Sequence, residues 1–143
     1  MITPDANVLL YAYNEAAPQY RVAKAWLQRQ FDEPSLIGFT WLTVTAFLRI
    51  STHPRTFPSP FSLKDASDIV DGWLEHPKST VLLPTSRHWS TLKTLAIGGQ
   101  APGPLIMDAH LAALAIEHGA TLATNDRDFT RFAGLKTVNP FET

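Results

Sequence analysis

The aspartates of this chain fall in a pattern that suits metal-ion chemistry. Asp108 lies near the start of the apolar run LIMDAHLAALA, Asp5 follows a short apolar start, and Asp126 and Asp128 follow the run TLAT. An ionised carboxylate that leaves water needs a cation, hydrogen-bond donors or a helix N-terminus to compensate for the lost hydration. Carboxylates gathered at one place would repel each other, and a divalent cation would relieve that repulsion.

The run around Asp108 predicts a helix that opens after Pro104. Three apolar residues share the face of Asp108 by the i+3, i+4 and i+7 rule, namely Leu111, Ala112 and Ala115. We expect that face to be buried, so Asp108 needs a partner. The plain alternative is an early-turn acid that the helix dipole stabilises by about 0.3 to 1 kcal/mol.

Asp5 and Asp126 each follow a predicted strand. Either one alone is explained as a helix N-cap, a position where aspartate is favoured. If the two strands are neighbours in a parallel sheet, as right-handed crossovers allow, Asp5, Asp108 and Asp126 converge at one end of that sheet. Oxygen ligands without a cysteine or histidine cluster favour Mg²⁺ or Mn²⁺ over zinc.

The elements that must position these acids alternate along the chain. Strands are predicted in MIT, SLIGF, TVLLP, TLAT and KTVN. Helices are predicted in ANVLLYAYN, PQYRVAKAWLQRQF, TWLTVTAFLRIST, LKDASDIVDGWLEH and RHWSTLKTLAIGG, in the run around Asp108, and briefly in NDRDFTRFA. Ser62 is expected to cap the fourth helix, with Asp65 in the capping-box position, and the three prolines of HPRTFPSPF predict a loop. This order favours an α/β fold with a mostly parallel sheet covered on both faces.

Composition narrows the class of protein. With 143 residues, of which 45% are hydrophobic and 17% charged, we expect one globular domain over residues 1–143. A net charge of −1 excludes a broadly basic surface for nucleic acid, although a local patch is allowed. The chain has no cysteine, which excludes disulfides and favours the reducing cytoplasm. Neither a signal peptide nor a membrane span is expected, because the apolar runs are too short.

Four segments together resemble a known family. The ordered set DANVLLYA, FLRI, MDAHLAALAIEHG and LATNDRDF is similar to the PIN domain, and specifically to the VapC toxins of bacterial toxin-antitoxin pairs. The resemblance spans nearly the whole chain. It implies a PIN-like three-layer sandwich with a central parallel sheet of about five strands. It also implies a Mg²⁺- or Mn²⁺-dependent ribonuclease, a VapB-like antitoxin partner and a homodimer.

The resemblance assigns the acids to family positions. Asp5, Asp108 and Asp126 match the first, third and fourth family acids, and Asp128 matches an acid that often follows. In this interpretation a metal ion held by Asp5 and Asp108 binds the scissile phosphate and lowers the pKa of the attacking water. Asp126 orients that water or holds a second ion, and Asp128 is a further metal ligand.

One motif departs from the family. The second family acid is usually a glutamate just before FLR, where this chain has Ala46. Thr43, Thr45, Asp128 or water would have to take its place. Two hypotheses follow. The retained acids favour a metal-dependent endoribonuclease toxin, whereas Ala46 favours a non-catalytic or weakly active RNA- or protein-binding module.

Two polar residues are predicted to bind substrate. Asn7 shares the motif of Asp5 and suits a hydrogen bond to a phosphate, although it also suits an ordinary early helix position. Arg49 follows Ala46 by three residues, so it shares the face of the missing acid and suits RNA phosphate or an ion pair. Weaker RNA-contact candidates are Arg55, Arg127 and Arg131.

Aromatic and histidine residues carry a less specific signal. The tryptophans stand at helical spacing from other apolar residues, which favours a core or partner interface over base stacking: Trp26, Trp41, Trp73 and Trp89. The early-helix residues Tyr11, Tyr20 and Trp26 are expected to be exposed and to mark a partner surface. The five histidines show no metal-ligand spacing: His53, His76, His88, His110 and His118.

Overall fold

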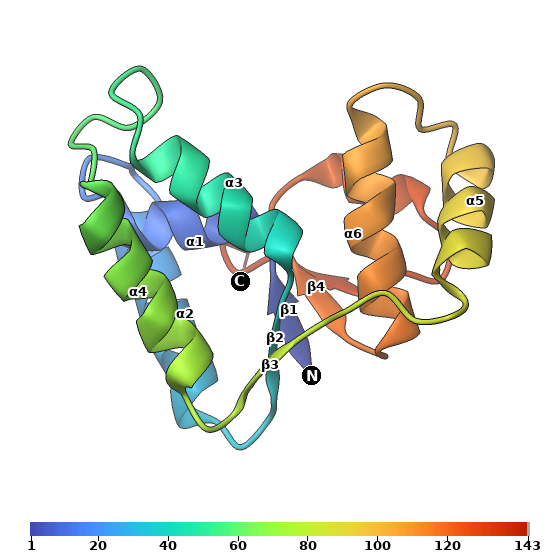
Figure 1. Cartoon of the computed structure of the whole chain (residues 1–143), viewed down its shortest axis with the longest axis horizontal. Coiled ribbons are helices and arrows are strands. Elements are labelled where there is room, and N and C mark those ends of the chain that lie inside the picture. The colour runs from blue at the N-terminus through green and yellow to red at the C-terminus, as the bar shows by residue number, and fades with distance from the viewer. Residues whose placement is uncertain (143) are drawn as a thin grey trace.

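The computed structural model describes residues 1–142 and contains one five-stranded sheet (Figure 1). The strands are β1 (Ile2–Pro4), β2 (Ile37–Phe39), β3 (Ser79–Val81), β4 (Thr121–Ala123) and β5 (Thr137–Val138), in the order β3-β2-β1-β4-β5. All four pairings are parallel. The pairing of Pro4 with Ala123 sets the carboxyl ends of β1 and β4 side by side. This confirms the neighbouring strands on which the predicted convergence of acids depends.

Within residues 1–142, six α-helices flank the sheet on both sides. They are α1 (Ala6–Tyr13), α2 (Tyr20–Asp32), α3 (Trp41–Ser51), α4 (Leu63–Glu75), α5 (His88–Gly98) and α6 (Leu105–Glu117), and a short 3₁₀ helix, η1 (Arg127–Arg131), follows β4. Figure 1 shows α1 to α4 gathered on one side of the strands and α5 with α6 on the other. The predicted three-layer α/β sandwich with a mostly parallel sheet of about five strands is confirmed.

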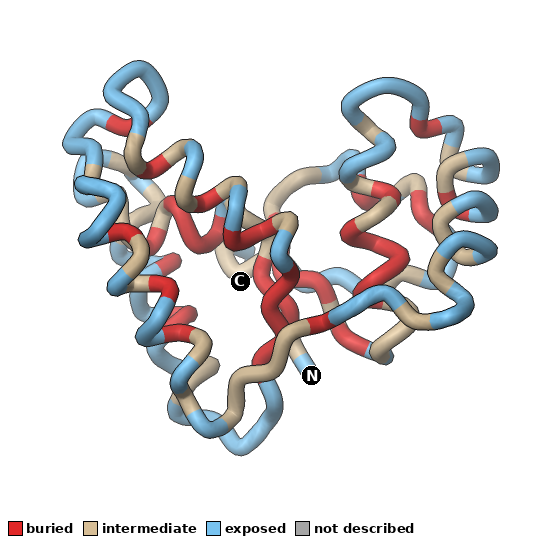
Figure 2. Tube along the Cα trace, viewed as in Figure 1, coloured by how far each residue is buried: buried red, intermediate tan, exposed pale blue. Residues whose placement is uncertain are grey.

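Hydrophobic clusters on both sides of the sheet hold the layers together. Beneath α3 and α4, Phe39 of the sheet stacks on Trp73, with ring centroids 5.6 Å apart. Beneath α5 and α6, a second cluster joins Leu95, Ala112 and Phe129. Figure 2 shows the buried residues concentrated along the strands and the inward sides of the helices. The predicted buried face of the Asp108 helix is confirmed, because Leu111, Ala112 and Ala115 are all buried.

The helix boundaries follow local signals in the sequence. The Ser62 side chain accepts a hydrogen bond from the Asp65 N–H, so the predicted cap of α4 is confirmed. The proline-rich segment HPRTFPSPF forms the loop between α3 and α4, as expected. Within residues 1–142, no helix is both long and apolar enough to cross a membrane.

Three large apolar side chains on the helices lie outside the core. Val22 of α2 is exposed, because the buried stripe of that helix runs through Ala23, Trp26 and Leu27. Trp41 and Trp89 are 51% and 69% exposed, unlike the buried Trp26 and Trp73. Both exposed tryptophans begin helices, where a side chain leans back beyond the first turn and away from the core.

The early aromatic residues are also less exposed than expected. Trp26 is buried, and Tyr11 and Tyr20 are half-buried. Tyr11 packs edge-on against Phe141 near the chain's end, a contact that the spacing within one helix does not reveal. Tyr20 instead lines a cavity of about 530 Å³ that also includes residues of α1 and α4.

Candidate metal centre

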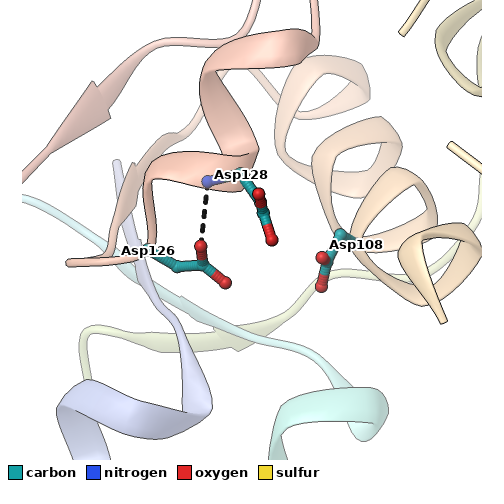
Figure 3. Close-up of side chains that lie close together, drawn as sticks. All are labelled: Asp108, Asp126 and Asp128. Carbon is teal, nitrogen blue, oxygen red and sulfur yellow. Dashed lines mark hydrogen bonds between the residues drawn. The ribbon is translucent and has the colours of Figure 1, made fainter. Parts of the chain in front are cut away.

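Three carboxylates converge at the carboxyl end of the sheet: those of Asp108, Asp126 and Asp128 (Figure 3). One oxygen atom of each lies within 4.8 Å of the others. Two oxygen ligands of one Mg²⁺ ion, each about 2.1 Å from it, lie at most about 4.2 Å apart. The observed spacing therefore fits a shared ion after a small side-chain adjustment, or with a water molecule in the shell.

Local structure explains why these side chains point at one another. Asp108 stands in the first turn of α6. Asp126 caps η1, and its Oδ1 atom accepts a 2.8 Å hydrogen bond from the Asp128 N–H (Figure 3). The Asp126 N–H itself donates to Thr124 Oγ1 at 3.0 Å. These hydrogen bonds fix the turn after β4, which carries the carboxylates of Asp126 and Asp128.

Asp5 lies beside this cluster and is held by a different set of bonds. Its Oδ1 accepts from the Ala6 N–H and its Oδ2 from the Thr124 hydroxyl, both at 2.8 Å. Asp5 is therefore an N-cap of α1, as its plainer interpretation predicted. Asp5 is nevertheless close enough for its charge to raise the pKa of Asp108, and for the charge of Asp126 to raise the pKa of Asp5.

Thr124 is the residue that the sequence did not single out. It is buried, and its hydroxyl joins Asp5 to the backbone of Asp126. Its position directly after a strand and two residues before an aspartate is the only signal that could have marked it.

The electrostatics of the cluster favour added positive charge. Burial raises the pKa of Asp5, hydrogen bonds from Thr124 and Ala6 counteract part of that rise, and the charge of Asp126 adds to it. For Asp108, burial and then the charges of Asp126, Asp5 and Asp128 raise the pKa to about 6, while Arg131 acts in the opposite direction. A bound cation would relieve this repulsion.

Comparison with known proteins places the chain in a family. Residues 2–135 match the PIN domain. The chain is 37% identical over 136 residues to ribonuclease VapC37 of Mycobacterium tuberculosis, covering 95% of this chain and 94% of that one. It is 38% identical over 140 residues to ribonuclease VapC33 of the same species, covering 98% of both. The chain belongs to the VapC ribonucleases of the PIN-domain family.

A solved VapC structure shares the fold. The VapBC2 complex of Rickettsia felis, bound to a DNA fragment from its promoter, superposes with a TM-score of 0.71 at 17% identity. The match covers 97% of this chain and 98% of that chain. The resemblance to VapC proteins read from the sequence motifs is thus confirmed.

In this VapC sequence, the hydroxyl groups of the threonines near Ala46 are hydrogen-bonded to partners outside the carboxylate cluster. Thr43 is buried and its hydroxyl oxygen accepts from the Thr40 hydroxyl at 3.0 Å. The Thr45 hydroxyl donates to the Trp41 carbonyl at 2.7 Å, within its own helix. Asp128, the other proposed substitute, contributes a carboxylate oxygen to the cluster.

The predicted substrate-binding residues of this VapC chain are accessible. Asn7 and Arg49 are both exposed, in α1 and α3. Neither side chain has a hydrogen bond or ion pair within residues 1–142, so both are free to meet a ligand. Arg55 and Arg127 are exposed as well. Their contacts with RNA stay predictions.

Histidines without recognisable spacing form a polar network in the VapC fold. His88 of α5 contacts the Glu117 carboxylate through Nδ1, and its Nε2 lies 2.8 Å from Nδ1 of His110. Glu117 also accepts from the N–H and hydroxyl of Thr85, at 3.0 and 2.6 Å. The Glu117 side chain is 1% exposed, so this network ties α5 to α6 from inside.

Glu117→Gln is expected to lower the free energy of unfolding by about 2 kcal/mol at neutral pH, because it removes a buried charge-assisted hydrogen bond. Burial alone would raise the pKa of Glu117, but hydrogen bonds from Thr85 and His88 outweigh it and hold that pKa below 4.5. The stabilisation is thus present above about pH 4.5 and lost as pH falls through the folded-state pKa. Urea unfolding at neutral and acid pH measures it. The control is Glu75→Gln, at an exposed position. If Glu117→Gln lowered the free energy of unfolding equally at both pH values, the stabilising role assigned to the Glu117 carboxylate would be contradicted.

Proposed function

We propose that the chain is a metal-dependent endoribonuclease that acts as the toxin of a type II toxin-antitoxin system. It hydrolyses RNA phosphodiester bonds with Mg²⁺ or Mn²⁺. The observation that carries this proposal is the convergence of Asp108, Asp126 and Asp128 within 4.8 Å, in a chain of the VapC ribonuclease family.

The donor set fits a hard divalent cation. All three side chains offer carboxylate oxygens, the ligands that Mg²⁺ and Mn²⁺ prefer. Asp128 is exposed and the other two are half-buried, so water and a phosphate oxygen have access to the remaining ligand positions. Mg²⁺ commonly keeps several waters, which is why three carboxylates suffice without an acid at position 46.

The four acids have two kinds of part in the proposed mechanism. A bound Mg²⁺ or Mn²⁺ supplies charge neutralisation at the phosphate and acidifies a bound water. Asp108, Asp126 and Asp128 would hold such an ion. Asp5, fixed by Thr124 and the start of α1, adds a fourth negative charge and an acceptor at the same end of the sheet.

A hollow beside Asp126 offers a place for an RNA nucleotide. It has a volume of about 280 Å³ and its lining includes Asn125, Arg127, Thr130 and Asn139. The Asn139 side-chain oxygen already accepts from the Phe141 N–H at 2.9 Å, which leaves its amide N–H groups directed to other partners. Asn7 and Arg49 are proposed as further substrate contacts.

The proposed partners are a VapB-like antitoxin and a second copy of the chain. The support is family membership together with the solved relative, which is itself a VapBC complex. A toxin that cleaves cellular RNA and is held in check by an antitoxin acts in the cytoplasm, and the lack of cysteine suits that compartment.

Metal removal tests the function directly. The purified chain, incubated with end-labelled RNA and Mn²⁺ or Mg²⁺, should yield discrete fragments, and excess EDTA should abolish them. Products would be resolved on denaturing gels. RNA binding without metal-dependent cleavage would overturn the proposal and identify the non-catalytic module that Ala46 suggests.

A further inference from the structure

We propose that Arg131 is a positioning residue that clamps η1 onto the loop between α5 and α6 and thereby fixes Asp128 in the metal centre. This inference rests on the proposed function, because the metal centre is the site whose geometry it controls. The sequence suggested only a weak RNA contact for this residue.

The guanidinium of Arg131 makes four contacts within this VapC fold. Its Nη1 donates to the carbonyl oxygens of Gly99, at 3.1 Å, and Gln100, at 3.0 Å. Its Nε donates to the Asp128 carbonyl at 3.1 Å. Its Nη2 lies 3.5 Å from the Asp128 carboxylate. The side chain therefore bridges the loop after α5 and the turn that carries the acid.

The hydrogen bonds to backbone carbonyls make the ion pair between Arg131 and Asp128 more effective in holding the carboxylate. The Asp128 side chain is 53% exposed, and an exposed pair of this kind is worth only about 0.2 to 1 kcal/mol by itself. Here three backbone carbonyls fix the plane of the guanidinium before it meets the carboxylate. A planar fork of donors at a fixed place restricts the carboxylate more than a free ammonium would.

The loop that Arg131 holds is tightly seated. A Cβ atom added at Gly99 would lie 2.8 Å from the Leu95 carbonyl and 3.1 Å from the Phe132 ring, so η1 and the end of α5 approach closely there. Gln100 has a φ of 50°, a conformation that non-glycine residues rarely adopt. Two hydrogen bonds from Arg131 to this segment help to hold that backbone in place.

The same loop leads into the other half of the metal centre. After Gln100 the chain reaches α6, whose first turn carries Asp108. Arg131 therefore fixes Asp128 directly. Through the loop it also holds the segment of chain that leads to Asp108. With alanine at position 46, the placement of Asp128 decides whether three carboxylates can share one ion.

Two substitutions separate geometry from charge. Arg131→Lys keeps the positive charge but loses the planar fork, whereas Arg131→Gln loses both. Calorimetric titration of the purified chain with MnCl₂ alone should show about tenfold weaker binding for Arg131→Lys, in line with losses for residues that orient metal ligands. If Arg131 acted through charge alone, the lysine variant would match the parent and the glutamine variant would bind Mn²⁺ more tightly.

Hydrogen exchange gives a second readout that needs no metal. The amides of Gly99, Gln100 and Ala101, which donate to carbonyls of α5, should exchange faster in both Arg131 variants. The core of α6 should keep its protection, which would show that the fold is intact. Arg87→Gln, an exposed arginine at the start of α5, is the matched control and should leave both readouts unchanged.

The outcomes separate this inference from the proposed function. A parent chain that binds Mn²⁺, with an Arg131→Lys variant that binds it equally tightly, would overturn the clamp and leave the proposed function standing. A parent chain that binds no Mn²⁺ would overturn the metal centre and the role of Arg131 in it together.

Discussion

Replacing Asp108 by asparagine is expected to lower Mn²⁺-dependent RNA cleavage by at least about a hundredfold, which corresponds to about 3 kcal/mol of transition-state stabilisation. Asp108 is the only one of the three clustered acids that comes from α6, so its loss opens one side of the ion's shell. Initial cleavage rates at saturating Mn²⁺ measure the effect. Asp71→Asn, an exposed acid on α4, controls for the charge change.

The same substitution should stabilise the metal-free protein. The pKa of Asp108 is raised from 3.8 to about 6, so ionising it in the folded state costs free energy. That cost is absent below about pH 3.8, grows as pH rises and is complete above about pH 6. Asparagine carries no charge and therefore avoids this cost. At neutral pH the free energy of unfolding of the variant should be higher by about 1 kcal/mol after allowance for solvent screening, and its melting temperature higher by about 3 °C.

Mn²⁺ should reverse the order of stability of the Asp108→Asn variant and the parent, because only the parent gains stability by binding the ion. Thermal unfolding in EDTA and in Mn²⁺, at acid and neutral pH, records both effects. If the variant cleaves RNA as fast as the parent and is no more stable in EDTA, Asp108 is an early-turn acid that the helix dipole stabilises.

The sequence allowed this end of the sheet to be predicted as the site because the positions of strands and of the acids after them are local signals, once β1 and β4 are assumed to be neighbours. Asp5 and Asp126 directly follow strands or nearly so, and parallel pairing of those strands brings their ends together. Asp108 was predictable from its place on an otherwise apolar helix face.

Contacts that join distant segments were not predictable in this way. The sequence gives no sign that the Thr124 hydroxyl meets Asp5, 119 positions away, or that Arg131 meets the carbonyl of Gly99, 32 positions away. Both partners depend on how the turns after β4 and α5 pack. For the same reason, the sequence predicted four acidic metal ligands without showing that Asp108, Asp126 and Asp128 form the cluster and that Asp5 lies beside it.

The histidine network illustrates the same limit. His88 lies on α5, whereas His110 and Glu117 share α6, so the contacts of His88 depend on helix packing that no motif spacing reveals. Trp41 and Trp89 failed as core residues because a helical period predicts a face but not whether the helix start reaches the core.

The side of α3 that carries Ala46 faces the half of the molecule that holds the metal centre. Leu42 packs against the cluster that includes Ala109 and Phe129, next to Asp108 and Asp128 in the chain. Ala46 follows Leu42 by four residues, so it lies on the same side of the helix, and it is half-buried. A glutamate at this position would extend toward the carboxylate cluster.

Ala46→Glu is therefore expected to tighten Mn²⁺ binding by about thirtyfold. A carboxylate about 4 Å from a divalent ion contributes about 2 kcal/mol even in a water-like dielectric, and that energy converts to this change in affinity. The same charge should lower the metal-free melting temperature, because it adds to the repulsion that already raises the pKa of Asp108. Calorimetry with MnCl₂ and thermal unfolding in EDTA measure the two effects.

Thr45→Glu adds an identical charge to α3 at an exposed position about 100° around the helix, so it should change neither quantity appreciably. In an Asp128→Asn background, Ala46→Glu should restore Mn²⁺ binding and RNA cleavage, since either acid then completes a set of three carboxylates. Equal Mn²⁺ affinities for the position 45 and position 46 variants would show that Ala46 lies outside the metal centre. Asp128 would then complete the set for a reason unrelated to the missing glutamate.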